Sequence, residues 1–186
     1  AKFDGGNFGA TFSLFSLSRQ NAIVVDQIFR ASGEQRNRGA ELSVFGEPVE
    51  GVRLIGGVTY VDAELKETQG GVNEGNTVIG VPEIQANING EWDLPFAPGL
   101  TLDGRVVYTG EQYVNEANTI DLESWARLDL GLRYRAEIGD VPLTFRARVD
   151  NVTDKGYWAS SGGYPGANYL IQGAPRTFMM TVSADF

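Results

Sequence analysis

The chain has 186 residues, with 24 acidic and 15 basic side chains, a formal net charge of −9, and neither His nor Cys. The absence of His and Cys excludes Ser–His and Cys–His nucleophile pairs, imidazole or thiolate metal sites, and disulfides. The negative charge argues against nucleic acid as a partner, because phosphate contacts require Lys and Arg. The longest uninterrupted apolar run, Ala22 to Val25, is far shorter than the about 20 residues of a membrane-spanning helix.

Apolar and polar residues alternate with a period of two along most of the chain, which is typical of strands with two unlike faces. In residues 125–135, the even positions are apolar and the odd positions after Trp125 carry Arg, Asp and Gly. The pattern predicts an all-β antiparallel fold with eight strands and no helix. In chain order, these strands are expected at 8–17, 37–46, 51–64, 84–93, 99–112, 125–135, 143–150 and 177–186.

The connections between these strands are alternately long and short, and the short ones contain or adjoin Gly, Pro and Asp, which favour turns. An up-and-down sheet produces this alternation when all the long loops lie at one end. Bacterial outer-membrane barrels have short periplasmic turns and long extracellular loops. The expected connections are 18–36, 47–50, 65–81, 94–98, 113–121, 138–140 and 153–173.

Alternation alone does not distinguish a soluble lipocalin-like barrel from a membrane barrel. Aromatic residues at apolar positions fall near both ends of the strands, as in the two aromatic girdles of a bilayer-spanning barrel. Trp92, Tyr134, Phe145 and Phe186 are expected near the inner interface, and Tyr60, Tyr108 and Phe178 near the outer one. Most strands reach the 9–11 residues needed to cross a bilayer. These features favour a transmembrane barrel in the bacterial outer membrane.

Four strings occur in order and end in a terminal Phe186. They are Arg38–Leu42, Thr59–Ala63, Val149–Tyr157 and Gly173–Phe178. In this combination, the chain resembles the C-terminal β-barrel portion of a TonB-dependent outer-membrane receptor of the ferric-siderophore type.

The resemblance implies a 22-stranded barrel with a plugged lumen, of which residues 1–186 form the C-terminal segment. We expect the plug domain and TonB box of the family to lie outside this chain. Since the chain starts Ala1-Lys2-Phe3, we expect a mature fragment or a piece of a longer protein. The expected function is to provide the barrel wall and part of the ligand vestibule of an active transporter that imports a ferric siderophore. The alternative is a self-contained eight-stranded membrane barrel that acts as an anchor or adhesion scaffold.

The resemblance also implies roles for individual residues. Aromatic residues of the outer loops are expected to contact the ligand, namely Tyr113, Trp158, Tyr164 and Tyr169. Apolar residues at alternate positions of the last strand are expected to form a barrel-assembly signal, namely Phe178, Met180, Val182 and Phe186. We expect no catalytic residue, no protein metal ligand and no cofactor, because the siderophore carries the iron. The expected partners are the ferric siderophore, a TonB-type energising protein that acts through the missing N-terminal region, outer-membrane lipid and the barrel-assembly machinery.

Overall fold

A computed structural model describes residues 1–25, 27–164 and 167–185. Among these residues there are thirteen strands and one short 3-10 helix. The elements are β1 (Lys2–Asp4), β2 (Phe8–Val25), β3 (Ile28–Val49), β4 (Val52–Glu67), η1 (Gln69–Gly71), β5 (Ile84–Asp93), β6 (Leu100–Thr109), β7 (Gln112–Tyr113), β8 (Asp121–Leu122), β9 (Trp125–Ile138), β10 (Val141–Asp150), β11 (Trp158–Tyr164), β12 (Ala167–Gln172) and β13 (Thr177–Ala184).

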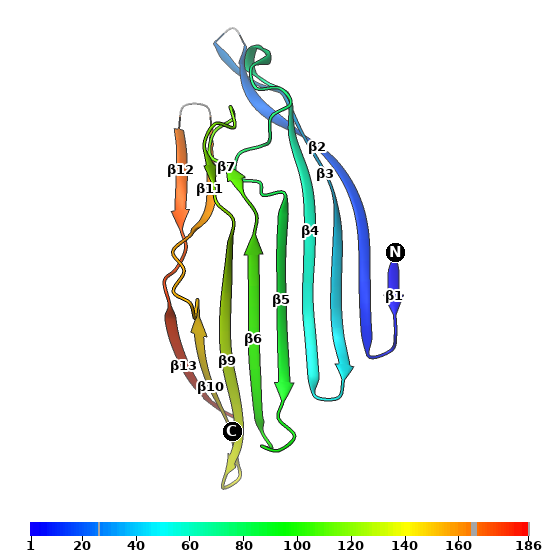
Figure 1. Cartoon of the computed structure of the whole chain (residues 1–186), viewed down its shortest axis with the longest axis vertical. Helices are drawn as coiled ribbons and strands as arrows, with labels where there is room; N and C mark the ends of the chain where they lie inside the picture. The colour runs from blue at the N-terminus through cyan, green and yellow to red at the C-terminus, as the bar shows by residue number, and fades with distance from the viewer. Residues whose placement is uncertain (26, 165–166, 186) are drawn as a thin grey trace.

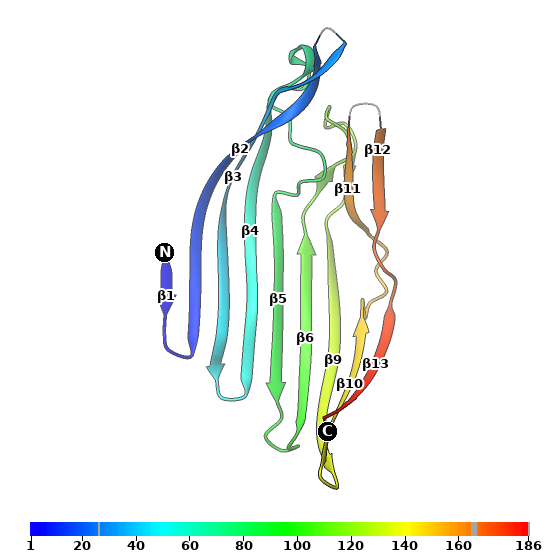
Figure 2. The same ribbon diagram turned by 180° about the vertical axis from the view of Figure 1, so that it is seen from behind.

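Nine of these strands form one antiparallel sheet in the order β1-β2-β3-β4-β5-β6-β9-β10-β13, in which the long strands lie side by side (Figures 1 and 2). Eight of the nine correspond to the eight predicted strands, so the all-β antiparallel prediction is confirmed. The described residues form an open sheet with β1 and β13 as its edges. The alternative of eight strands closing on themselves is therefore not the arrangement of this chain.

The two ends of the sheet differ as the connection lengths predicted. The short turns β3–β4, β5–β6 and β9–β10 lie at the lower end in Figure 1, and the long connections lie at the upper end. Gly51, Gly99 and Gly139 in the short turns have φ of 76°, 83° and 66°, in the left-handed region that glycine adopts without steric cost. We call the end with the long connections the outer end.

The prediction that residues 18–36 form a long loop is wrong. The β2–β3 pairing continues through Ser18↔Arg36 and Asn21↔Gly33 to Val25↔Ile28, with one irregularity after Asn21. Apolar and polar residues do not alternate regularly in this segment. Backbone hydrogen bonds between strands do not require an apolar face, so pairing extends beyond the stretch that shows the sequence pattern.

Several other boundaries also differ from the prediction, and three of them lie at the outer end. The strand expected at 99–112 ends at Thr109, and Gln112–Tyr113 instead pairs with Asp121–Leu122. The connection expected at 153–173 contains the β11–β12 hairpin. The strand expected at 51–64 continues to Glu67. The first two segments form separate pairings at the outer end, whereas the third continues the β3–β4 pairing.

The main sheet has one polar and one apolar face. The polar face carries Arg53, Glu91, Asp103, Asp129 and Arg148, which share register rows across β4 to β10. The apolar face carries exposed aliphatic side chains such as Leu42, Val58, Ile88, Val106 and Leu132. Within the described residues, the buried hydrophobic side chains are only Ala63, Leu65, Leu94 and Trp125. The apolar face is therefore the surface that a bilayer would cover.

Aromatic side chains on the apolar face lie toward both ends of the strands. Toward the outer end, Tyr60 is opposite Ile84, and Phe178 is opposite Val149. Toward the short turns, Trp92 is opposite Leu102, and Tyr134 is opposite Leu100. Phe186, expected in the inner girdle, lies outside the described residues. The two girdles predicted from the sequence are therefore present in the described part of the sheet.

Candidate functional site: the outer connections and the polar face

Three long connections meet at the outer end and are joined by hydrogen bonds. The Thr77 amide N–H donates to Asn118 Oδ1 at 2.7 Å, and Asn118 Nδ2 donates back to the Thr77 carbonyl at 3.0 Å. The carbonyl of Tyr113 accepts from the Gly80 amide at 3.0 Å and from Ser161 Oγ at 3.2 Å. Residues 68–83 and 110–124, with the described residues 151–164 and 167–176, therefore form one continuous wall, which we call the outer wall.

Tyr113, predicted to contact the ligand, lies in β7 at the centre of the outer wall. Its backbone carbonyl is the shared acceptor that joins the other two connections. Tyr113 also lines a cavity of about 270 Å³, together with Asp121 and Ser124. Tyr113 thus combines a structural role in its backbone with a position beside a cavity.

Trp158, also predicted to contact the ligand, begins β11 and lines a cavity of about 450 Å³. This cavity shares Asp121 and Ser124 with the Tyr113 cavity, so the structure brings these two predicted residues to adjoining hollows. The other residues that line the Trp158 cavity are Leu122, Glu123, Trp125, Lys155, Gly156, Tyr157 and Gln172.

Tyr169 lies in β12, outside the lining of both cavities. Its ring covers Gly162 on the paired strand, where an added Cβ would come within 2.5 Å of the ring. The side chain of Tyr164, at the end of β11, lies outside the described residues. The structure therefore groups Tyr113 with Trp158 and places Tyr169 separately on the exposed β11–β12 hairpin.

The wall of the Trp158 cavity includes an aromatic and cationic cluster that the sequence did not single out. The rings of Trp125 and Tyr157 lie 4.2 Å apart between centroids, and Arg127 Nη1 donates to the Tyr157 hydroxyl at 3.0 Å. Trp125 and Arg127 belong to β9, on the polar face, whereas Tyr157 follows β10. This cluster holds the start of the last long connection against the sheet. Its sequence signals are the aromatic residue at the start of a predicted strand and Tyr157 at the end of the Val149–Tyr157 string.

Asn151, the first residue of the connection 151–176, holds this connection against β9 by a hydrogen bond to Asp129. It is 1% exposed and has a φ of 54°, a conformation that Asn tolerates well. Its amide donates to Asp129 Oδ1 at 2.8 Å, and its side-chain amide donates to the carbonyls of Lys155 at 3.0 Å and Ala174 at 3.1 Å. The Asn151 side chain thus closes the turn at residues 151–155 and also fastens residue 174.

The polar face is a network of ion pairs across neighbouring strands. Asp129, whose side chain is 0% exposed, accepts from Arg127 at 3.0 Å and lies 3.5 Å from Arg148. Arg148 also reaches Asp150 at 2.5 Å and Asp103 at 3.3 Å. Arg groups form several directed hydrogen bonds at once, which suits a crowded polar wall. The Arg and Asp side chains of neighbouring strands thus form a ladder of ion pairs along the polar face.

Two negative results apply to the described residues. In residues 1–25, 27–164 and 167–185, no group of three or more His, Cys, Asp or Glu side chains is arranged to hold a metal ion. In the same ranges, no helix is long and apolar enough to cross a membrane.

The predicted assembly residues Phe178, Met180 and Val182 lie at alternate positions of β13, opposite Val149, Ala147 and Phe145 of β10. All three are exposed on the apolar face, and Met180 is 86% exposed. The fourth predicted residue, Phe186, is outside the described part of the chain. The three described residues thus form an apolar row on an edge strand.

An open antiparallel sheet with a lipid-compatible face, girdles and long outer connections defines a segment of an outer-membrane barrel. Residues 1–152 match the family model described as "TonB dependent receptor-like, beta-barrel". The chain belongs to this family of outer-membrane β-barrel proteins, which confirms the resemblance and the location expected from the sequence.

Similar proteins are named as siderophore receptors. The chain is 44% identical over 187 residues to the ferrichrome receptor FcuA of Yersinia enterocolitica, covering 100% of this chain and 24% of that protein. It is 30% identical over 183 residues to the ferrichrome outer membrane transporter/phage receptor of Escherichia coli, covering 95% of this chain and 24% of that protein.

Among solved structures, BauA, the ferric preacinetobactin receptor from Acinetobacter baumannii, aligns with a TM-score of 0.88 and 43% identity. The alignment covers 100% of this chain and 28% of BauA. This chain therefore spans about a quarter of the length of the relatives it matches. These similar proteins are named as receptors or transporters rather than enzymes.

Proposed function

We propose that residues 1–186 are the C-terminal segment of the barrel domain of a TonB-dependent receptor that imports a ferric siderophore. The observation that carries the proposal is the 44% and 43% identity, over the whole chain, to receptors named for ferrichrome and ferric preacinetobactin. The siderophore supplies the ligands to iron, so the wall needs no metal site of its own. A TonB-type protein acts through a region outside this chain.

The outer wall is the proposed contribution of this segment to the ligand vestibule. Trp158 and Tyr113 line adjoining cavities there, and Tyr169 is exposed on the neighbouring hairpin. Aromatic rings offer a flat apolar surface, and Tyr and Trp add a polar atom that forms hydrogen bonds. We include Tyr164 because it ends the same strand as Trp158.

The test uses the full-length receptor in a strain without other siderophore receptors. Uptake of ⁵⁵Fe supplied on a panel of siderophores identifies the cargo, and receptor-dependent uptake of none of them contradicts the proposal. Trp158→Ala is then expected to weaken binding of that siderophore about tenfold, as expected for a lost aromatic contact of about 1.4 kcal/mol. Phe96→Ala is the matched control, since Phe96 is an exposed aromatic residue in the β5–β6 turn at the opposite end. If Trp158→Ala and Phe96→Ala weakened siderophore binding equally, Trp158 would not be a ligand-contact residue.

We also propose that Phe178, Met180, Val182 and Phe186 signal assembly to the barrel-insertion machinery. The alternate exposed positions on β13 support this role. Val182→Ser is expected to lower the amount of folded receptor in the outer membrane, measured by its shift in electrophoretic mobility on heating. Thr181→Ser, on the opposite face of the same strand, is the control. Equal amounts of folded receptor in the two variants would contradict the role.

A further inference from the structure

The last long connection is closed at its base by hydrogen bonds between its two ends. Asn151 Nδ2 donates to the Ala174 carbonyl at 3.1 Å, and the Gly173 amide donates to the Tyr157 carbonyl at 2.9 Å. We call residues 151–157 and 173–176 the neck of this connection. Because the two ends are joined, the position of the β11–β12 hairpin depends on how the neck is held.

One side chain of the sheet, the Asp129 carboxylate of β9, holds the neck at two points. Its Oδ1 accepts a hydrogen bond from the Asn151 amide at 2.8 Å. Its Oδ2 accepts from Arg127 Nη2 at 3.0 Å, and Arg127 Nη1 donates to the Tyr157 hydroxyl at 3.0 Å. Asp129 thus contacts one end of the segment 151–157 directly and the other end through Arg127.

The second of these two points lies in the wall of the Trp158 cavity. Tyr157 directly precedes Trp158, and both residues line the cavity together with Trp125. The Tyr157 ring packs on Trp125 with centroids 4.2 Å apart, and an added Cβ at Gly173 would clash with the same Tyr157 ring. Asp129 is fully buried and is not part of the cavity lining. Its effect on a ligand in the cavity is therefore exerted through Tyr157.

The charge of Asp129 matters more to Arg127 than to its other cationic neighbour. Arg148 lies 3.5 Å from Asp129, but it also contacts Asp150 at 2.5 Å and Asp103 at 3.3 Å. Within the described residues, Asp129 is the one ion-pair partner of Arg127. Loss of the Asp129 charge would therefore release Arg127, whereas Arg148 would keep two carboxylate partners.

We propose that Asp129 is a positioning residue for ligand binding. It acts through Arg127 to hold Tyr157, and so keeps the Trp158 cavity in the shape that binds the ferric siderophore. The inference rests on the proposed function, because it concerns the same cavity. A side chain of the polar face, outside the cavity, would thereby set the affinity of the outer wall for its cargo.

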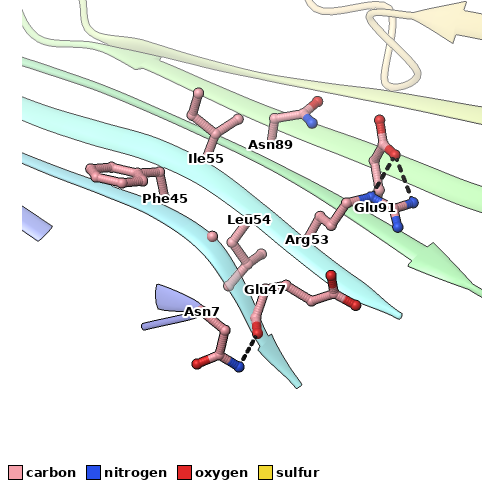
Figure 3. A pocket seen from close by; sticks show the side chains of 9 residues that line it. Asn7, Phe45, Glu47, Arg53, Leu54, Ile55, Asn89 and Glu91 are labelled. Atoms are coloured by element: carbon pink, nitrogen blue, oxygen red, sulfur yellow. Dashed lines mark hydrogen bonds and ion pairs between the residues drawn. The ribbon is translucent and has the colours of Figure 1, made fainter. Parts of the chain in front are cut away.

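A similar carboxylate at the other end of the polar face provides the matched control. Glu91 of β5 contacts Arg53 at 3.0 Å and Arg133 at 3.2 Å, so two Arg side chains share this carboxylate as well. Figure 3 shows the Arg53–Glu91 pair beside the hollow that Phe45 and Ile55 line near the short turns. Glu91→Gln thus removes one negative charge from a comparable group, at the end opposite to the outer wall.

The test measures equilibrium binding of an ⁵⁵Fe-loaded siderophore to the full-length receptor in native outer membranes, per folded receptor. The probe is ferrichrome, for which the similar FcuA is named, or the chelate that the uptake panel identifies in its place. Asp129→Asn keeps an oxygen for the Asn151 amide and is expected to raise Kd about tenfold, because the charged hydrogen bond from Arg127 is lost. Glu91→Gln is expected to raise Kd less than about twofold. An unchanged Kd in Asp129→Asn, or equal increases in the two variants, would overturn the proposal.

A double-mutant cycle separates positioning from a general loosening of the fold. Tyr157→Phe removes the hydroxyl that Arg127 holds and is expected to raise Kd to a similar extent. In the Tyr157→Phe background, Asp129→Asn is expected to add less than about a twofold further increase, because the link that it breaks is already gone. A further increase of about tenfold, as for two independent effects, would contradict the positioning role.

A second variant breaks the same link without changing the buried carboxylate. Arg127→Lys replaces a forked guanidinium by a single ammonium, which does not offer the same paired donors to Asp129 and Tyr157. It is expected to raise Kd about as much as Asp129→Asn, and it tests the proposal even if Asp129→Asn fails to assemble. A Kd equal to that of the unmodified receptor would overturn the role of Asp129.

Uptake is measured in parallel to separate this proposal from the proposed function. Uptake by the unmodified receptor, together with an unchanged Kd in Asp129→Asn and Arg127→Lys, would support the proposed function and overturn the role of Asp129 alone. A receptor that takes up none of the chelates would contradict the proposed function, and the role of Asp129 in ligand binding would fail with it.

Discussion

At the scale of single residues, a glycine makes room for the ion pair that joins β6 to β10 across β9. Asp103 is opposite Gly131, and Gly131 is opposite Arg148. A Cβ at position 131 would lie 2.3 Å from Asp103 Oδ1, where an Arg148–Asp103 contact of 3.3 Å exists now. Because Gly131 has no side chain, the Asp103 carboxylate of β6 and the Arg148 guanidinium of β10 can meet across β9.

Gly131→Ala is expected to destabilise the receptor by up to about 1 kcal/mol, since the added methyl group displaces the Asp103 carboxylate and breaks a partly exposed ion pair. Asp103 would have to move, and its contact with Arg148 would be lost. The measurement is the urea midpoint of unfolding of the full-length receptor. Gly104→Ala is the matched control, because a Cβ there would lie at an ordinary 3.5 Å from Leu130. A control as destabilised as Gly131→Ala would contradict the explanation.

At the scale of elements, the outer connections behave as parts of one wall because each is fastened to the next. Asn118 has a φ of 52°, and its side chain holds both the amide and the carbonyl of Thr77. Asn76 adds a hydrogen bond from Nδ2 to the Glu116 carbonyl at 2.8 Å. Backbone groups of 68–83 that would otherwise need water are therefore satisfied by the neighbouring connection.

Asn118→Ala is expected to increase hydrogen exchange at the Thr77 amide roughly fivefold, the effect of losing a hydrogen bond worth about 1 kcal/mol. The measurement is hydrogen–deuterium exchange of the full-length receptor, analysed by peptide. Asn115→Ala is the control, because the Asn115 side chain bonds Thr119 and Ile120 within its own connection. Faster exchange at Thr77 in the control would show that the whole connection had loosened.

The strands of the bilayer region could be predicted because one face is apolar and the other polar. The predicted strand 84–93 agrees with β5, and 143–150 lies within β10. The β11–β12 hairpin could not be predicted, since Ser160 to Gly163 do not alternate and Ser161 is held by the Tyr113 carbonyl. That contact joins residues 48 positions apart in the chain.

The candidate site was only partly predictable for the same reason. Trp158 and Tyr113 could be named as candidates because the resemblance to the receptor family implies ligand contact by aromatic residues of the outer loops. The cluster of Trp125, Arg127 and Tyr157 could not, because two of its members belong to a strand whose pattern indicates only a wall. The hollow lined by Phe45 and Ile55 was missed because these two residues interrupt the alternation on strands that are otherwise less regular. Only the pairing of β3 with β4 brings them together.

At the scale of the whole molecule, one face of the sheet points toward lipid and the other toward the lumen. This orientation determines which substitutions each face can tolerate. Ile88 and Asn87 are neighbours on β5, both exposed, and lie on the apolar and polar face respectively. Because the hydrocarbon core offers no water, an Arg on the lipid face near the bilayer midplane is costly, whereas an Arg on the lumen face is solvated.

Ile88→Arg is therefore expected to destabilise the full-length receptor in phospholipid vesicles by about 2–4 kcal/mol. Asn87→Arg is expected to change the free energy of unfolding by less than about 1 kcal/mol, as for a solvated surface position. Urea titrations of both variants in the same vesicles make the comparison. Equal losses, or a larger loss for Asn87→Arg, would reverse the assignment of the faces.

The extension of β2, β3 and β4 beyond β5 has a mechanical consequence. β3 is paired on both sides from Glu34 onward and with β2 alone nearer its tip, and the segment from Ile28 to Arg38 rises roughly 30 Å at about 3.3 Å per residue. A paired ribbon of this length bends as a unit, whereas an equally long loop would change shape residue by residue. Any molecule that approaches this end of the sheet would therefore meet a paired ribbon that moves as one piece.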